Sequence, residues 1–158
     1  MLDQFAHSNP AFGAICLRWV CQGYQEQQIR QDGAAQGLHF LWGILSLVLL
    51  APERIRRELP LTAKGKLSIL LNENPEWKVE LPHAIKGWAK PFWSSVRMGV
   101  ATGVLTFAEG RLLSLGSTKE PDSEASVLLR RHAVALGKIF AKEGGDRAIA
   151  LVFGLVVS

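Results

Sequence analysis

The sequence predicts a mainly α-helical fold with one small β-hairpin, and three observations lead to this prediction. Apolar side chains recur at three- and four-residue spacing over most of the chain, which is the period of a helix buried on one side. Glycine and proline divide these stretches into segments, and strand-like alternation is confined to residues 104–114. The 158 residues are 48% hydrophobic and 20% charged, which suits a packed core and argues against wholesale disorder.

The first helix is expected from Pro10 to Gln22. Ser8 or Asn9 can cap it, and Pro10 suits the first turn, where its missing N–H is not needed. A helix that is apolar on two faces must be covered on two faces, by this chain or by a partner. The two apolar stripes are Phe12, Ile15, Cys16 and Trp19, and Leu17, Val20, Cys21 and Tyr24.

The next helix, expected over Phe40–Ala51, is apolar enough to raise the question of a membrane anchor. A bilayer span takes about 20 apolar residues, whereas this run offers roughly a dozen before Pro52 disfavours helix at the residue preceding it. The amino terminus has no basic cluster ahead of an apolar stretch, so no signal peptide is predicted. We expect a cytoplasmic protein in which a glutamine-rich linker, Gln25–Gly37, joins two helices packed as an antiparallel hairpin.

Residues 61–116 predict three short helices followed by a hairpin, the order of a winged-helix-like unit. The hairpin turns at Glu109-Gly110 and pairs Val104–Thr106 with Leu112–Ser114. The three helices are expected from Thr62 to about Leu71, over residues 80–90, and from Pro91 to Gly103.

A long helix is expected near the carboxyl end, capped by Asp122 or Ser123 and ended by Gly144-Gly145. Its apolar stripe comprises Leu129, His132, Ala133, Leu136, Ile139 and Phe140. The tail from Asp146 onwards is apolar and needs a surface to cover it. The predicted organisation is an N-terminal helical hairpin (1–60), the winged-helix-like unit (61–116) and C-terminal helices packing on the rest (117–158), together forming one compact domain.

No catalytic residue, metal site or cofactor is predicted. The chain lacks a P-loop and a glycine-rich dinucleotide turn. Cys16 and Cys21 point in different directions on a helix and are expected to be small buried hydrophobes, and the four histidines show no ligand spacing. The net charge of +4 permits an acidic partner without requiring one.

The segment "HAIKGWAKPFWSSVR" interleaves basic and aromatic side chains. Because the third helix of a winged helix can enter the DNA major groove, Lys86, Lys90 and Arg97 are candidate nucleic-acid contacts, with Arg111 on the hairpin. The competing interpretation places the aromatic side chains in the core and the lysines in solvent. The sequence favours this structural or protein-docking role over direct DNA reading. The aromatic and aliphatic side chains in question are Trp88, Phe92, Trp93 and Val96.

Several phrases, in this order, resemble the middle components of bacterial three-component ABC systems, and most of all the middle subunit of Lamassu-type anti-phage systems. They are "NPAFGAICL", "GYQ", "GLHFLWGILSLVLLAPERIRRELP", "TAKGKLSILLNENPE" and "LGKIFAKEGGDRAIALVFGL". The resemblance covers nearly the whole chain, and it rests on the order and spacing of these phrases. One departure is the tail, which stays apolar through "LVFGLVVS" where a basic or proline-ended finish is expected.

The resemblance implies a non-catalytic adaptor that bridges an SMC-like ATPase and an effector subunit, expected to be a nuclease. DNA would be reached through the complex, and neither a membrane nor a small-molecule substrate is expected. The alternative is a free winged-helix DNA-binding transcriptional regulator. The candidate partner contacts are Phe12, Trp19, Trp42, Trp93, Leu151 and Phe153.

Overall fold

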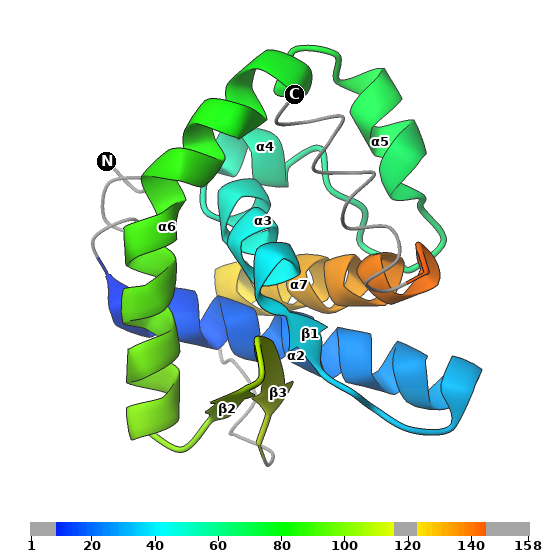
Figure 1. The fold of residues 1–158 in the computed structure, drawn as a ribbon. Coiled ribbons are helices and arrows are strands. Elements are labelled where there is room, and N and C mark those ends of the chain that lie inside the picture. Colours follow the sequence, from blue (N-terminus) through cyan, green and yellow to red (C-terminus); the bar gives the residue numbers. More distant parts are fainter. Residues whose placement is uncertain (1–8, 116–122, 145–158) are drawn as a thin grey trace.

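The computed structural model describes residues 9–115 and 123–144 and is mainly helical with a small antiparallel sheet (Figure 1), which confirms the predicted fold class. The helices are α2 (Pro10–Asp32), α3 (Phe40–Leu50), α4 (Glu53–Arg56), α5 (Leu67–Glu73), α6 (Trp77–Ala101) and α7 (Glu124–Lys142). The strands are β1 (Leu38–His39), β2 (Leu105–Ala108) and β3 (Arg111–Ser114).

Helix α2 begins where the sequence predicts and continues further than expected. The Asn9 Oδ1 accepts hydrogen bonds from the N–H groups of Ala11 and Phe12, at 3.0 and 3.3 Å. The expectation of a linker from Gln25 was wrong, because α2 continues to Asp32 and ends at Gly33, whose φ of 81° is a left-handed helix stop.

The glutamines of this extension are part of the packed structure, which is why the segment is ordered. The Gln28 Oε1 accepts hydrogen bonds from the backbone N–H groups of Gln36 and Gly37, and the Gln25 Oε1 accepts one from Ser114. Glutamine is also a good helix former. The same glutamine side chains that suggested a linker therefore anchor α2 to the segment before β1 and to β3.

Helix α3 is the buried centre of the molecule, as its apolar run predicts. It contacts α2, α6 and α7, and Trp42 stacks on Phe140 with ring centroids 4.4 Å apart. The predicted antiparallel hairpin with the first helix is not formed. Figure 1 shows α3 rising steeply from α2 instead of running antiparallel beside it. Among residues 9–115 and 123–144, no helix combines the length and the apolar character needed to cross a membrane.

Helix α6 replaces the two short helices expected around Pro91. It runs unbroken from Trp77 to Ala101 with Pro82 and Pro91 inside it. An interior proline costs about 3 kcal/mol or more. Burial of a row of large side chains offsets this cost, since each contributes roughly 1.5–3 kcal/mol. That row comprises Trp77, Leu81, Trp88, Phe92 and Val96.

The predicted hairpin is present, and it has a third strand that the sequence did not reveal. Strands β2 and β3 pair antiparallel, with Phe107 opposite Leu112, and the turn residues Glu109 and Gly110 have positive φ values of 54° and 78°. Strand β1 pairs with β3, giving the order β1-β3-β2. This order is compatible with a winged-helix-like arrangement, whose detail stays a prediction, as does the division at residues 60 and 116.

Helix α7 begins at the predicted cap, where the Ser123 Oγ accepts a hydrogen bond from the Ser126 N–H at 3.1 Å. It packs along α2 with very little separation. A Cβ atom added to Gly23 would lie 2.1 Å from the Val134 carbonyl oxygen, and one added to Gly137 would lie 2.0 Å from the Val20 carbonyl oxygen. Glycine at both positions therefore allows the two backbones to touch. The expected apolar tail lies outside the described residues.

Candidate functional site

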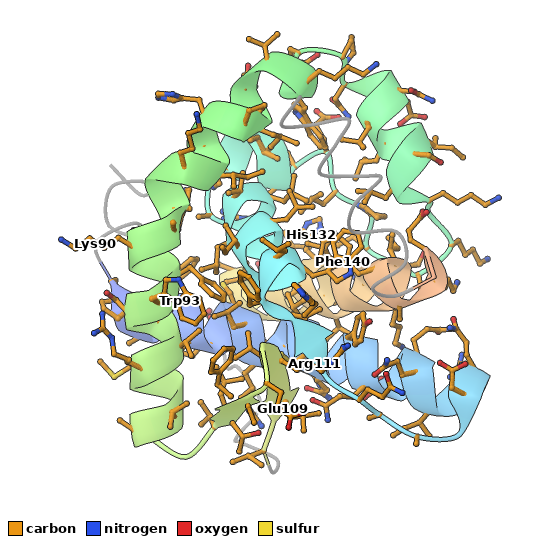
Figure 2. The ribbon with its side chains drawn as sticks, in the orientation of Figure 1. Lys90, Trp93, Glu109, Arg111, His132 and Phe140 are labelled. Carbon is orange, nitrogen blue, oxygen red and sulfur yellow. The ribbon has the colours of Figure 1, made fainter. Side chains whose placement is uncertain are left out.

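The exposed face of α6 brings three of the predicted basic residues into one row. Lys86, Lys90 and Arg97 are separated by four and seven residues, close to one and two turns of a helix with about 3.6 residues per turn. All three are exposed, and Figure 2 shows Lys90 pointing away from the molecule. The single acid of α6, Glu80, forms an ion pair with Arg54. We call Lys86, Lys90 and Arg97 the α6 stripe.

Arg111 does not belong to this row. It lies in β3, opposite both His39 and Ala108, and its Nη1 donates a hydrogen bond to the Gly37 carbonyl oxygen at 3.4 Å. Figure 2 shows it on the hairpin beside Glu109. The four candidate nucleic-acid contacts therefore divide between the α6 stripe and the sheet, and their role stays a prediction.

Trp93 joins three elements through aromatic contacts. Its ring centroid lies 5.8 Å from that of Phe40 on α3, 4.8 Å from that of Phe92 and 5.3 Å from that of Phe107 on β2. The side chain is half-buried, whereas Trp88, five positions earlier on α6, is buried. Trp93 therefore combines a structural role with an accessible edge.

The other candidate partner contacts have different surroundings. Phe12 is half-buried and keeps an accessible edge, so its role stays a prediction. Trp19 and Trp42 are buried in the core of this chain, with 7% and 0% of their surfaces exposed. These two side chains are therefore used within the chain. Leu151 and Phe153 lie outside the described residues.

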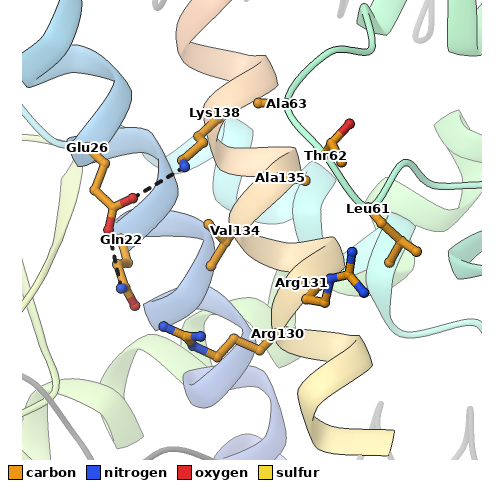
Figure 3. A pocket seen from close by; sticks show the side chains of 10 residues that line it. All are labelled: Gln22, Glu26, Leu61, Thr62, Ala63, Arg130, Arg131, Val134, Ala135 and Lys138. Atoms are coloured by element: carbon orange, nitrogen blue, oxygen red, sulfur yellow. Dashed lines mark hydrogen bonds and ion pairs between the residues drawn. The ribbon is translucent and has the colours of Figure 1, made fainter. Parts of the chain in front are cut away.

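A groove that sequence reasoning missed lies beside α7 and encloses about 210 Å³ (Figure 3). Its lining joins segments far apart in the chain, and only the Arg130-Arg131 pair on α7 signalled a basic edge. The Lys138 Nζ lies 3.5 Å from the Glu26 Oε2, and the Gln22 Nε2 donates to the Glu26 Oε1 at 3.4 Å. We call this the α7 groove, lined by Gln22, Glu26, Leu61, Thr62, Ala63, Arg130, Arg131, Val134, Ala135 and Lys138.

Side chains of α7 hold one wall of the groove in place. The His132 Nδ1 lies 3.3 Å from the Pro60 carbonyl oxygen, and the Lys142 Nζ donates to the Ala63 carbonyl oxygen at 2.6 Å. Burial lowers the pKa of His132, and the nearby Arg56 and Arg131 lower this pKa further, although hydrogen bonding to the Pro60 carbonyl opposes the shift. The imidazole is therefore neutral at pH 7.

The buried cysteines are unsuited to thiolate chemistry. Burial raises the pKa of Cys16 to about 12 and raises the pKa of Cys21 as well, so both remain protonated thiols near neutral pH. In the part of the chain that the structure describes, no three histidine, cysteine, aspartate or glutamate residues gather as a metal ion would require.

The fold and these surfaces together define a small helical protein whose candidate sites are surfaces for contact with other molecules. The model of the family described as ABC-three component (ABC-3C) system Middle Component 3 matches residues 5–156. The chain belongs to this family of middle components. This confirms the broader part of the resemblance seen in the sequence. No curated protein and no solved structure matches the chain.

Proposed function

We propose that this chain is the non-catalytic adaptor of a cytoplasmic, Lamassu-type anti-phage complex, in which it bridges an SMC-like ATPase and an effector nuclease. The observation that carries the proposal is the family match over residues 5–156, because a middle component implies partner subunits. The Lamassu subtype and the identities of the two partners rest on the ordered phrases in the sequence.

The placement of the candidate surfaces supports a bridging role. An adaptor needs at least two contact surfaces that can be occupied at the same time. The α6 stripe belongs to one helix alone, whereas the α7 groove is built by α2, α7 and the segment around Thr62. Partners at these two surfaces would use different residues of this chain.

Co-expression with the neighbouring genes tests the proposal. We expect the tagged chain to retain both the ATPase and the effector, and each of them singly when the other gene is omitted. The chain purified alone should show no ATPase or nuclease activity. A stable ATPase–effector complex that forms and functions in cells lacking this chain would contradict the bridging role.

A second candidate, a DNA-binding regulator, is favoured by the α6 stripe and the hairpin that follows it. Duplex binding through these cations would weaken with salt, with a slope of about 0.9 in log K per log salt for each phosphate contacted. Replacing Lys86, Lys90 and Arg97 with alanine should then flatten the slope. Alanine at the exposed Arg30, Lys64 and Lys66, which lie outside α6, is the matched control. Equal slopes for both triple variants would exclude DNA reading by α6.

A further inference from the structure

Helix α5 has a buried apolar face that the other described helices and strands do not account for. Its three leucines, Leu67, Leu70 and Leu71, are 1%, 8% and 7% exposed, whereas Ile69, on another side of the helix, is 51% exposed. Every other described helix packs extensively against at least one helix or strand, but α5 does not. Figure 1 shows α5 standing apart from α3 and α6. A further segment is therefore needed to cover the leucines.

The end of α7 brings the chain to this face. The Glu143 Oε1 accepts a hydrogen bond from the Leu67 N–H at 2.9 Å, and the Lys142 Nζ donates one to the Ala63 carbonyl oxygen at 2.6 Å. Gly144 follows with a φ of 97°, a left-handed conformation that ends a helix and turns the chain. The residues after Gly144 therefore start beside the first turn of α5.

The other stretches outside the described residues start elsewhere. Residues 1–8 precede Asn9, and the 23 residues of α2 place that end about 34 Å from the end that reaches α7, at 1.5 Å per residue. Residues 116–122 lead into the first turn of α7, about 28 Å from its last, and their sequence, GSTKEPD, is polar. The apolar sequence near α5 is AIALVFGLVV, residues 148–157.

We propose that residues 148–157 fold back over α5 and cover Leu67, Leu70 and Leu71. The seven residues of α5 are about 10 Å long, so ten apolar residues are enough to cover them. A segment attached beside its binding surface is present at high effective concentration, which favours it over a second copy or a partner subunit. Leu151 and Phe153 then belong to a contact within the chain, and this inference does not depend on the adaptor function.

Cysteine cross-linking in the full-length chain tests this placement. Leu70→Cys, on the buried face, is combined in turn with Leu151→Cys, Phe153→Cys and Leu155→Cys. Ile69→Cys, adjacent in sequence but exposed, is the matched control in the same three combinations. Because a disulfide needs its two Cα atoms close together, we expect one Leu70 combination to form an intrachain disulfide at least about tenfold faster than its Ile69 control.

Hydrogen exchange after removal of residues 145–158 gives an independent measurement. We expect the amides of α5 to exchange at least about tenfold faster in the truncated chain, whereas those of α2 keep their rates. Adding a synthetic peptide of residues 146–158 in excess should restore the protection of α5.

Equal disulfide rates for the Leu70 and Ile69 combinations would overturn the inference. Disulfides that form only between two chains would also overturn it, because they would assign the face of α5 to a second copy. Unchanged exchange of α5 in the truncated chain would do the same. If the truncated chain fails to fold, the cross-linking rates decide the question, since those variants keep the full chain.

Discussion

The free energy of unfolding should depend on pH through His132, the neutral imidazole on the packed face of α7. An exposed histidine has a pKa near 6.5, and burial lowers the pKa of His132 in the folded chain. As the pH falls below about 6.5, the unfolded chain takes up a proton that the folded chain resists. The free energy of unfolding should therefore decrease over that range, by up to about 1.4 kcal/mol per pH unit until the folded state is also protonated.

Urea denaturation at pH 7.5 and 5.5 measures this effect. We expect His132→Gln to lose part of the acid sensitivity, since glutamine does not titrate. His83→Gln, on the exposed surface of α6, serves as the control and should keep the wild-type dependence. If His132→Gln and the wild type lose equal stability on acidification, another group is responsible.

Trp93 and the neighbouring lysines should differ in their effect on stability. Because Trp93 is half-buried among three rings, Trp93→Ala should cost about 2–3 kcal/mol, less than the roughly 3–5 kcal/mol of a fully buried site. Lys86→Ala with Lys90→Ala should change stability by less than about 0.5 kcal/mol. Denaturant midpoints of the two variants measure both changes. An equal loss of stability in the two variants would show that Trp93 is not a packing contact.

Individual residues were predictable from sequence where the chemistry is local. The cap at Asn9 and the Glu109-Gly110 turn depend on side chains and dihedrals within a few residues. The α7 groove was not predictable, because Leu61 and Arg131 come together only through tertiary packing. The burial of Trp42 against Phe140 likewise depends on how α3 and α7 pack against one another.

The contact between α2 and α7 should be the element pairing most sensitive to added volume. A methyl group at Gly23 or Gly137 meets a backbone carbonyl that cannot rotate away. Gly137→Ala should cost at least the roughly 1–3 kcal/mol of an overpacked core. Gly87→Ala on α6 is the matched control, since nothing lies within 4 Å of the added Cβ. That variant should gain about 0.5–1 kcal/mol from helix propensity.

Thermal melts of these two variants and of Gly23→Ala provide the measurement. Opposite signs for Gly137→Ala and Gly87→Ala are expected. A melting temperature for Gly137→Ala equal to that of the wild type would show that α2 and α7 can separate at little cost, which would contradict their close approach.

The boundaries of helices and strands were predicted well where a capping residue or a change in hydrophobic period marks them. They were predicted poorly where glutamine or proline suggested a break in a helix. Glutamines suggested a linker, although helix propensity and the hydrogen bonds accepted by Gln28 keep residues 25–32 in α2. Pro91 suggested a helix break, although burial of Phe92 and its neighbours holds α6 together. Strand β1 has two residues, too few to show alternation.

The whole molecule should unfold as one unit, because its elements depend on partners that are distant in sequence. Strand β3 needs β1, and α6 packs on α2 and α3. We therefore expect an isolated 61–116 fragment to show no cooperative transition, whereas the full chain shows a single one. Circular dichroism and fluorescence melts measure both. A cooperative, independently folded fragment would instead support the boundaries predicted from sequence.

The contact between α2 and α7 also affects how the chain folds while it is being synthesised. Gln31 donates a hydrogen bond to the Ala141 carbonyl oxygen across 110 positions. At about 5–20 residues per second, a ribosome needs roughly 5–20 seconds to make that intervening length. During this interval the apolar side chains of α2 have no α7 to cover them. The nascent chain is therefore expected to finish folding only after α7 has been made, and to offer α2 to chaperones until then.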